Sequence, residues 1–161
     1  MELWLARHAQ AEPMAASGHD RDRALTATGQ ATCQALNGWL AEHLNHHPAP
    51  GTIAFSPATR TRQTIERVTQ GLVLTPPQQL EALWAATTGD LVALITHLAD
   101  HTPPVWLIGH NPGLSDLVAW LAEPLPPPGM KPGTLVRLNI ELPLHPGVGE
   151  ILEVVQPNEA L

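Results

Sequence analysis

The chain is poor in cysteine and in long apolar runs. The single cysteine, Cys33, excludes an intramolecular disulfide and is typical of a reducing compartment. No apolar run approaches the ~18 residues of a membrane-spanning helix, so we expect none. No basic segment followed by an apolar core stands at the N-terminus, and we therefore expect no secretory signal. These absences favour a cytoplasmic protein.

Basic residues are also scarce. The chain has 8 Lys and Arg against 15 Asp and Glu, a formal net charge of -7. This balance argues against a nucleic-acid partner or an anionic membrane surface. Five of the eight basic side chains nevertheless lie in two short segments; they are Arg7, Arg21, Arg23, Arg60 and Arg62. An acidic chain that concentrates its arginines in this way is expected to bind a compact anion.

The length of 161 residues and the apolar content of 43% predict one globular domain, residues 1–161, with a buried core. Strand-like and helical segments alternate along the chain. Strands are expected at 2–5, 52–55, 78–83, 105–108, 134–142 and 150–155. Helices are expected at 26–43, from 56 to about 70, at 88–98 and at 111–121. This order predicts a three-layer α/β fold, in which a mostly parallel central sheet has helices on both faces and ends in a C-terminal antiparallel hairpin.

Helix starts are expected directly after two of these strands. Ser56 and Asn111 are the expected N-caps, and each is followed by proline at the first helical position. Thr88 and its neighbours offer a cap for the helix that runs to residue 98.

Three strands end in residues suited to binding phosphate. The first ends in Arg7 and His8, the second leads to Ser56 with Arg60 one turn further on, and the fourth leads to His110. Since the carboxyl ends of parallel strands meet at one edge of a sheet, these side chains are expected to converge there. Guanidinium forks, imidazoles and helix N-termini, with no carboxylate nearby, would suit a phosphoryl group.

Over residues 3–121, the order and spacing of four motifs resemble those of a known protein family. They are Arg7-His8-Ala9, the segment 22–29, the segment 56–64, and Gly109-His110-Asn111-Pro112-Gly113. Together they resemble the histidine phosphatase superfamily. Their order and spacing, the compact size and the segment 83–90 look most like its SixA-type phosphohistidine phosphatase branch. The resemblance implies a phosphoglycerate-mutase-like fold.

The resemblance also implies roles for individual residues. His8 would be the nucleophile that accepts the phosphoryl group. Arg7 and Arg60 would bind the phosphoryl oxygens, and His110 would donate a hydrogen bond to them. Arg23 would contact the phosphate or close over it, although a loop salt bridge is the alternative.

No metal or other cofactor is implied, because the arginines would neutralise the phosphoryl charge. Three histidines, His43, His46 and His47, have spacing that a metal site could use. A helix C-terminus, which favours cations, accounts for them better.

The chain departs from the superfamily pattern at three places. Ala9 stands where glycine is usual, and Gln10 stands where many members have an acid. Larger members carry a glutamate in an inserted segment that protonates the leaving oxygen. Here Glu81 is the only carboxylate between residues 64 and 90 that could approach the site, and we do not assign it that role. Trp84 follows at a position suited to forming a wall of the site.

A missing acid favours a P–N bond as substrate, since an imidazole leaves near its own pKa of ~6.5 and needs less protonation than an alkoxide. We therefore expect a signalling phosphatase that removes phosphoryl groups from phosphohistidine on a protein partner through a covalent phospho-His8 and releases phosphate. A small-molecule phosphomonoesterase using the same site is the enzymatic alternative. A phospho-binding module without turnover is the alternative of another class.

Overall fold

A six-stranded sheet forms the centre of the molecule, in the order β3-β2-β4-β1-β5-β6. The computed structural model describes residues 1–157. Strands β1, β2, β3 and β4 run parallel, whereas β5 pairs antiparallel with β1 and β6 pairs antiparallel with β5. The strands are β1 (Glu2–Arg7), β2 (Thr52–Phe55), β3 (Gln78–Gln79), β4 (Val105–Gly109), β5 (Leu135–Asn139) and β6 (Glu150–Val155). The expected parallel sheet with a C-terminal antiparallel pair is confirmed.

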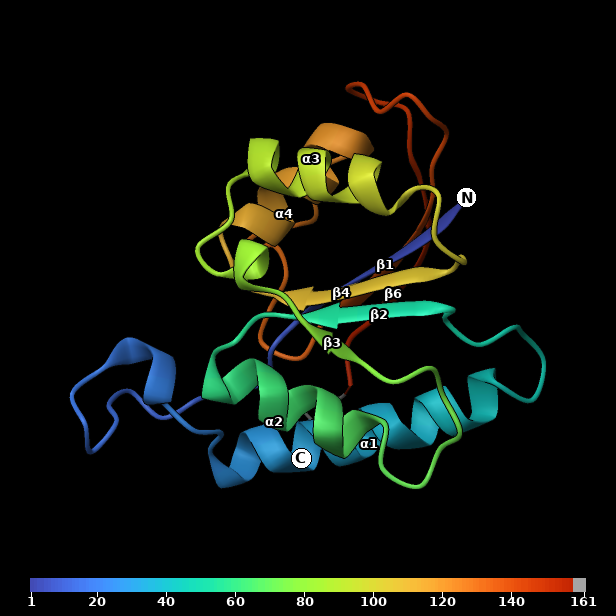
Figure 1. Ribbon diagram of the computed structural model, residues 1–161. Helices are drawn as coiled ribbons and strands as arrows, with labels where there is room; N and C mark the ends of the chain where they lie inside the picture. The colour runs from blue at the N-terminus through green and yellow to red at the C-terminus, as the bar shows by residue number, and fades with distance from the viewer. Residues whose placement is uncertain (158–161) are drawn as a thin grey trace.

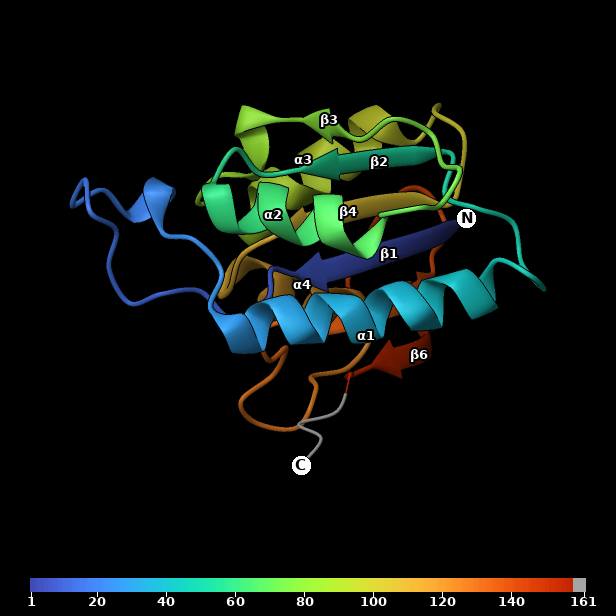
Figure 2. The same cartoon turned by 90° about the horizontal axis from the view of Figure 1, so that it is seen from below.

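Helices cover both faces of this sheet, as expected (Figure 1). Helices α1 (Ala27–His43) and α2 (Thr59–Val68) lie on one face. Helices α3 (Thr88–Leu98) and α4 (Gly113–Leu121) lie on the other. Figure 2, seen from the side of α1 and α2, shows these two helices lying across β1, β4 and β2. The three-layer architecture is therefore that of the α/β class.

The core divides into two halves because successive side chains of a strand point to opposite faces. In β1, Leu3 and Leu5 pack towards α3 and α4, whereas Trp4 packs towards α1 and α2. The same alternation separates Leu107 from Trp106 in β4. The central strands are apolar throughout because both of their faces are covered.

Three helix starts differ from the expected ones. The N-cap of α2 is Ala58 and not Ser56, because the Ser56 hydroxyl is hydrogen-bonded to His110. Helix α3 is capped by Thr87, one residue before the expected cap, and Thr87 forms a reciprocal capping box with Asp90. The N-cap of α4 is Pro112, while the Asn111 side chain still accepts a hydrogen bond from the backbone of the first turn.

The expected strand at 78–83 is mostly wrong. Only Gln78 and Gln79 pair with β2, and the chain then turns into the short 3-10 helix η2 (Glu81–Leu83). An edge strand without a second neighbour gains little from extending further. Strand β5 is likewise shorter than the expected 134–142.

The segment 9–25 forms a loop that projects from the carboxyl edge of the sheet (Figures 1 and 2). It contains one turn of 3-10 helix, η1 (Asp20–Asp22). Among residues 1–157, no helix has the length and apolar character needed to cross a membrane.

Candidate active site

The carboxyl ends of β1, β2 and β4 bring the expected site residues together. Arg7 of β1 lies opposite Gly109 of β4, and the backbone N–H of His8 donates to the Gly109 carbonyl at 3.2 Å. The backbone N–H of Ser56 donates to the Ile108 carbonyl at 3.0 Å. The register of the sheet therefore places His8, Ser56 and His110 side by side.

The side chain of His8 is held as a neutral imidazole in which one nitrogen is unprotonated. Its Nδ1 lies 2.7 Å from the Ala9 carbonyl, which can only accept, so Nδ1 carries the proton and Nε2 carries the lone pair. Burial lowers the pKa of His8 to about 3; the bond to Ala9 opposes this shift, and the nearby His110, Arg60 and Arg7 add to it. The ring is therefore unprotonated at Nε2 near neutral pH.

Arg60 lies at the centre of the site. Its Nε donates to His8 Nε2 at 3.3 Å, and its Nη2 contacts His110 Nδ1 at 3.4 Å. It lies in the first turn of α2, a position fixed by the end of β2. The side chain is only 6% exposed, and burial lowers its pKa from the usual arginine value.

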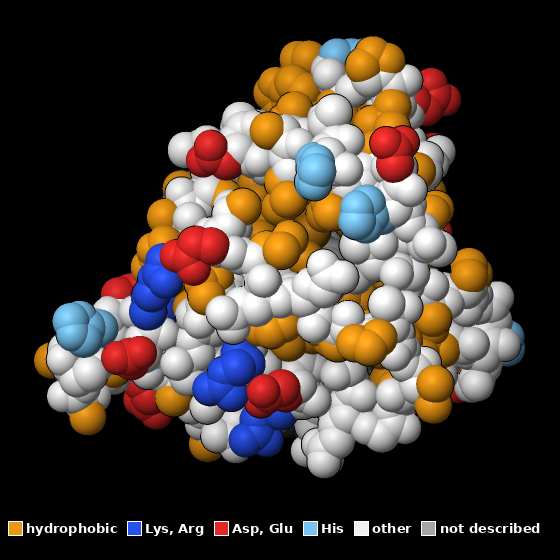
Figure 3. Space-filling view, in the orientation of Figure 1, with side chains coloured by type: hydrophobic (Ala, Val, Ile, Leu, Met, Phe, Trp, Pro, Cys, Tyr) orange, Lys and Arg blue, Asp and Glu red, His pale blue; other side chains and the backbone are white. Residues whose placement is uncertain are grey.

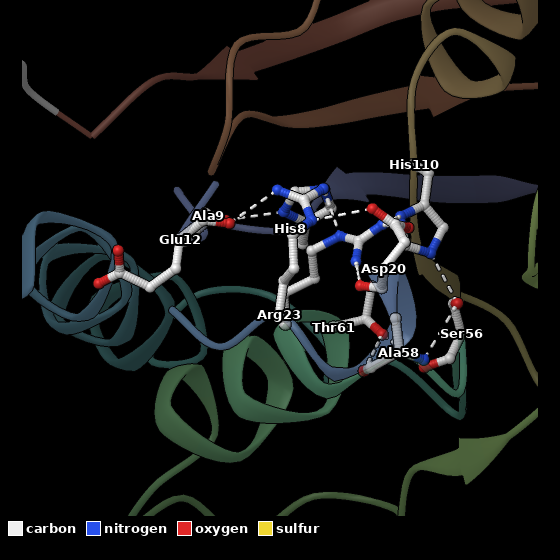
Figure 4. Close-up of polar contacts among 10 residues, drawn as sticks. His8, Ala9, Glu12, Asp20, Arg23, Ser56, Ala58, Thr61 and His110 are labelled. Atoms are coloured by element: carbon white, nitrogen blue, oxygen red, sulfur yellow. Dashed lines mark hydrogen bonds and ion pairs between the residues drawn. The ribbon is translucent and has the colours of Figure 1, made fainter. Parts of the chain in front are cut away.

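His110 faces His8 across the site, with ring centroids 5.3 Å apart. Its Nε2 lies 2.7 Å from the Ser56 hydroxyl (Figure 4). Because Arg60 can only donate, His110 Nδ1 is the acceptor and Nε2 donates to Ser56. Burial, followed by the charge of Arg60, lowers the pKa of His110 to about 4.

Arg7 is anchored from the opposite side. Its Nη1 donates to the Met130 carbonyl at 2.9 Å, and Asn111 Nδ2 donates to the same carbonyl at 2.8 Å. The buried Nε of Arg7 has no hydrogen-bond partner among residues 1–157. An unpaired buried N–H is costly unless a ligand satisfies it, so this donor is suited to an oxyanion.

Arg23 lies in the wall of the same pocket, as the resemblance implies. Its Nε donates to Asp20 Oδ1 at 2.9 Å and its Nη1 donates to the Glu12 carbonyl at 2.9 Å. The structure therefore shows the loop salt bridge and a place in the pocket wall, and a contact between Arg23 and phosphate stays a prediction.

Asp20 is the residue that sequence reasoning missed. Its Oδ2 accepts from Arg60 Nη2 at 3.1 Å and its backbone carbonyl accepts from Arg60 Nη1 at 2.8 Å. Figure 4 shows Asp20 between His8 and His110. The expectation that no carboxylate lies near the site is wrong. The i, i+3 spacing of Asp20 and Arg23 signals their ion pair in the sequence, but no local pattern signals the contact of Asp20 with Arg60.

Glu81 does not reach the pocket. It pairs with Arg21, whose guanidinium lies over the Trp84 ring at 4.6 Å from the centroid. Trp84 packs edge-on against His110, with centroids 5.2 Å apart, but it lies behind His110 and does not itself line the pocket. In Figure 3 the basic side chains of this face lie beside acidic ones.

The pocket bounded by these side chains has a volume of about 240 Å³. It is lined by Arg7, His8, Gln10, Ala11, Arg23, Arg60, His110, Asn111 and Pro132. Within residues 1–157, no group of three or more His, Cys, Asp or Glu side chains could hold a metal ion. Arginine and neutral imidazole are thus the groups available to an anion here.

The chain belongs to the histidine phosphatase superfamily (branch 1), whose family model matches residues 3–110. An uncharacterised protein of Mycobacterium tuberculosis, Rv1276c, is 32% identical over 104 residues, which cover 65% of this chain and 62% of that relative.

Two further relatives are similar over most of the chain. A phosphohistidine phosphatase SixA homolog of Haemophilus influenzae is 28% identical over 146 residues, 86% of this chain and 87% of that protein. The structure of the protein histidine phosphatase SixA complexed with tungstate shares the fold, with a TM-score of 0.81 and 24% identity over 98% of this chain and 97% of that one. These similarities support the SixA-type branch.

Proposed function

We propose that this protein hydrolyses phosphohistidine on a protein partner through a covalent intermediate on His8 Nε2. The observation that carries the proposal is the tautomer of His8. Its Nδ1 proton is held by Ala9, and its Nε2 lone pair faces the guanidinium of Arg60. A nucleophile beside a cation is the arrangement that phosphoryl transfer needs.

The first step transfers the phosphoryl group. The Nε2 lone pair forms a bond to phosphorus while the P–N bond of the substrate breaks, and the electron pair of that bond returns to the departing ring. The ring leaves as a neutral imidazole because its other nitrogen carries a proton in the substrate. Arg7, Arg23 and Arg60 neutralise the charge on the phosphoryl oxygens. Because Nδ1 keeps its proton, the phosphorylated His8 ring is cationic.

The second step hydrolyses this intermediate. Water attacks phosphorus, the P–N bond to His8 breaks, and the electron pair returns to Nε2. The ring leaves as a neutral imidazole, which is a good leaving group because Nδ1 remained protonated. Inorganic phosphate and a proton are released, and His8 returns to its starting tautomer.

Two observations support phosphohistidine as the substrate. Glu81 is bound to Arg21, and the pKa of Asp20 is below its usual value, since hydrogen bonds from Arg60 and Arg23 outweigh the effect of burial. Neither carboxyl is thus a ready proton donor for an alkoxide. The 240 Å³ pocket is also smaller than the ~300–1,000 Å³ of sites that enclose small molecules. It suits a phosphoryl group presented on a larger surface.

The name of the Haemophilus influenzae relative points the same way. Other structures with this fold include a putative alpha-ribazole-5'-P phosphatase of Escherichia coli, with a TM-score of 0.70 and 18% identity over 98% of this chain and 97% of that one. A phosphomonoester substrate is therefore the alternative that the test must distinguish.

The test uses a ³²P-labelled phosphohistidine phosphocarrier protein beside a panel of sugar and nucleoside phosphates. We expect rapid loss of label from the protein and slow turnover of the esters. His8→Ala should reduce turnover by at least ~10³-fold and abolish the acid-labile phosphoenzyme. His97→Asn, an exposed histidine on α3, is the matched control and should leave both unchanged. Rapid ester turnover with stable phosphohistidine would overturn the substrate, and activity in His8→Ala would overturn the nucleophile.

A further inference from the structure

Each of the three nitrogens of the Arg60 fork already has at least one partner. Nε donates to His8, Nη1 donates to the Asp20 carbonyl, and Nη2 contacts both the Asp20 carboxylate and His110. Asp20 is therefore the residue that accepts hydrogen bonds from both terminal nitrogens of Arg60. A phosphoryl group bound by the same fork would need the positions that Asp20 occupies.

The Asp20 carboxylate also joins two guanidinium groups. One oxygen accepts from Arg60 at 3.1 Å and the other accepts from Arg23 at 2.9 Å. Carboxylates and phosphoryl groups present the same pair of acceptor oxygens to a guanidinium fork. The hydrogen bonds from both arginines hold the pKa of Asp20 below its ordinary value despite the opposing effect of burial, so the group is an anion near neutral pH.

A phosphoryl dianion and this carboxylate cannot share the fork at low cost, because like charges repel strongly within a few ångströms in a partly buried site. Arg60 is 6% exposed and cannot turn away to serve a second anion, whereas the Asp20 side chain is 57% exposed and adjoins solvent. Of the two partners, Asp20 is the one free to leave.

We propose that Asp20 occupies the phosphoryl subsite of the free enzyme and exchanges places with the phosphoryl group, so that it weakens the binding of free phosphate and promotes product release. This inference rests on the proposed function, because it takes the His8 and Arg60 pocket as the phosphoryl site.

The local structure allows such an exchange. Asp20 lies in η1, and the backbone N–H of Arg23 donates to the Asp20 carbonyl within the same turn. The Asp20 carboxylate can therefore leave Arg60 while it keeps its hydrogen bond from Arg23. After hydrolysis, the Asp20 carboxylate would again accept the hydrogen bonds of Arg60 and would so displace the phosphate product.

The experiment measures inorganic phosphate binding by titration calorimetry, and phosphate inhibition of turnover, for wild type, Asp20→Asn and Asp20→Ala. The matched control is Asp22→Asn, which removes the same charge from the same turn but from a carboxylate that is bonded to Ser17. We expect both Asp20 variants to bind phosphate about tenfold more tightly, with the inhibition constant falling in parallel. Asp22→Asn should stay within about twofold of wild type.

Unchanged or weaker phosphate binding in both Asp20 variants would overturn the inference. Turnover lost at unchanged phosphate affinity would also overturn it and would assign Asp20 to proton transfer. An equal gain in phosphate affinity in Asp22→Asn would show that the effect comes from net charge alone, and this result would also overturn the inference. The proposed function is tested separately: it fails if His8→Ala stays active or if the phosphohistidine substrate is not turned over, whatever the phosphate affinity of the Asp20 variants.

Discussion

At the scale of single residues, the hydroxyl of Ser56 allows His110 to adopt either neutral tautomer. In the free protein His110 Nε2 donates to this hydroxyl, and its Nδ1 accepts from Arg60. To donate to a phosphoryl oxygen, Nδ1 must carry the proton instead. A hydroxyl can donate as well as accept, so Ser56 can support either tautomer of His110 without leaving a buried nitrogen unpaired. The side chain of Ser56 is completely buried, which excludes water from this role.

Ser56→Ala is therefore expected to reduce kcat about tenfold, since His110 loses the partner that permits its tautomer to change. The free energy of unfolding should fall by ~1 kcal/mol because Nε2 is left unpaired. Steady-state kinetics and urea denaturation measure the two effects, with Thr96→Ala, an exposed hydroxyl on α3, as control. An unchanged kcat would show that the His110 tautomer does not matter to turnover.

At the scale of secondary structure, helix starts position the site and the close packing around them fixes their place. Helix α4 begins at Gly113 against the backbone of Ala86, and a Cβ at Gly113 would lie 2.2 Å from the Ala86 carbonyl oxygen. The same helix start follows His110 directly. Glycine is thus required here by contact with another segment, whereas Gly38 in the exposed part of α1 has open space around it.

Replacement of Gly113 and of Gly38 by alanine is expected to change the free energy of unfolding in opposite directions. Gly113→Ala should lower the free energy of unfolding by about 1–3 kcal/mol, because backbone must shift to admit the methyl group. Gly38→Ala should raise it by about 0.5–1 kcal/mol, because alanine restricts the unfolded chain and favours the helix. Urea denaturation of both variants provides the comparison. A stable Gly113→Ala protein would contradict the close approach.

The sequence was sufficient to predict the sheet edge but not the helix caps. His8 and His110 follow buried strands directly, and Arg60 lies in the first helical turn after another, so parallel pairing of the strands brings them together. The expected caps Ser56 and Asn111 were misplaced because their side chains bind distant groups, His110 and the Met130 carbonyl. Such long-range competition leaves no local signal. Asp20 was missed for the same reason, since it lies in an irregular loop whose contacts depend on the fold.

At the scale of the whole molecule, a net charge of -7 coexists with a buried cationic pocket. The arginines make that pocket positive, and burial together with this charge keeps its two histidines neutral. Burial is the first cause of their lowered pKa values, about 3 for His8 and about 4 for His110. The buried His43 also has a pKa lowered by burial. The molecule therefore contains histidines that the unfolded chain would protonate first.

Stability is expected to fall as the pH falls from 7 to 5. An unfolded histidine binds a proton below pH ~6.5, whereas His8 and His110 stay unprotonated until about pH 4 or below, so acid favours the unfolded chain. The expected loss is about 2 kcal/mol per histidine between pH 7 and pH 5. Asp20, whose pKa is lowered, would lose its contribution only at lower pH.

Urea denaturation at pH 7 and pH 5 measures this loss. The double variant His8→Asn, His110→Asn should retain only a small part of it, from His43 and the other titrating groups. Equal stability of the wild-type protein at the two pH values would show that the buried imidazoles are not held neutral.

The loop that carries Asp20 and Arg23 is closed at its base. The Thr26 N–H donates to the Gln10 carbonyl at 3.0 Å, and the Glu12 N–H donates to the Ala24 carbonyl at 2.8 Å. The chain thus leaves β1 and returns to α1 at one point, and residues 13–23 form a loop whose two ends are fixed. Loops of other length or composition can be inserted between these fixed ends while the sheet, His8 and Arg60 remain in place. A change in the length of this loop would therefore alter the entrance to the pocket while the sheet keeps its register, provided that Asp20 and Arg23 remain beside Arg60.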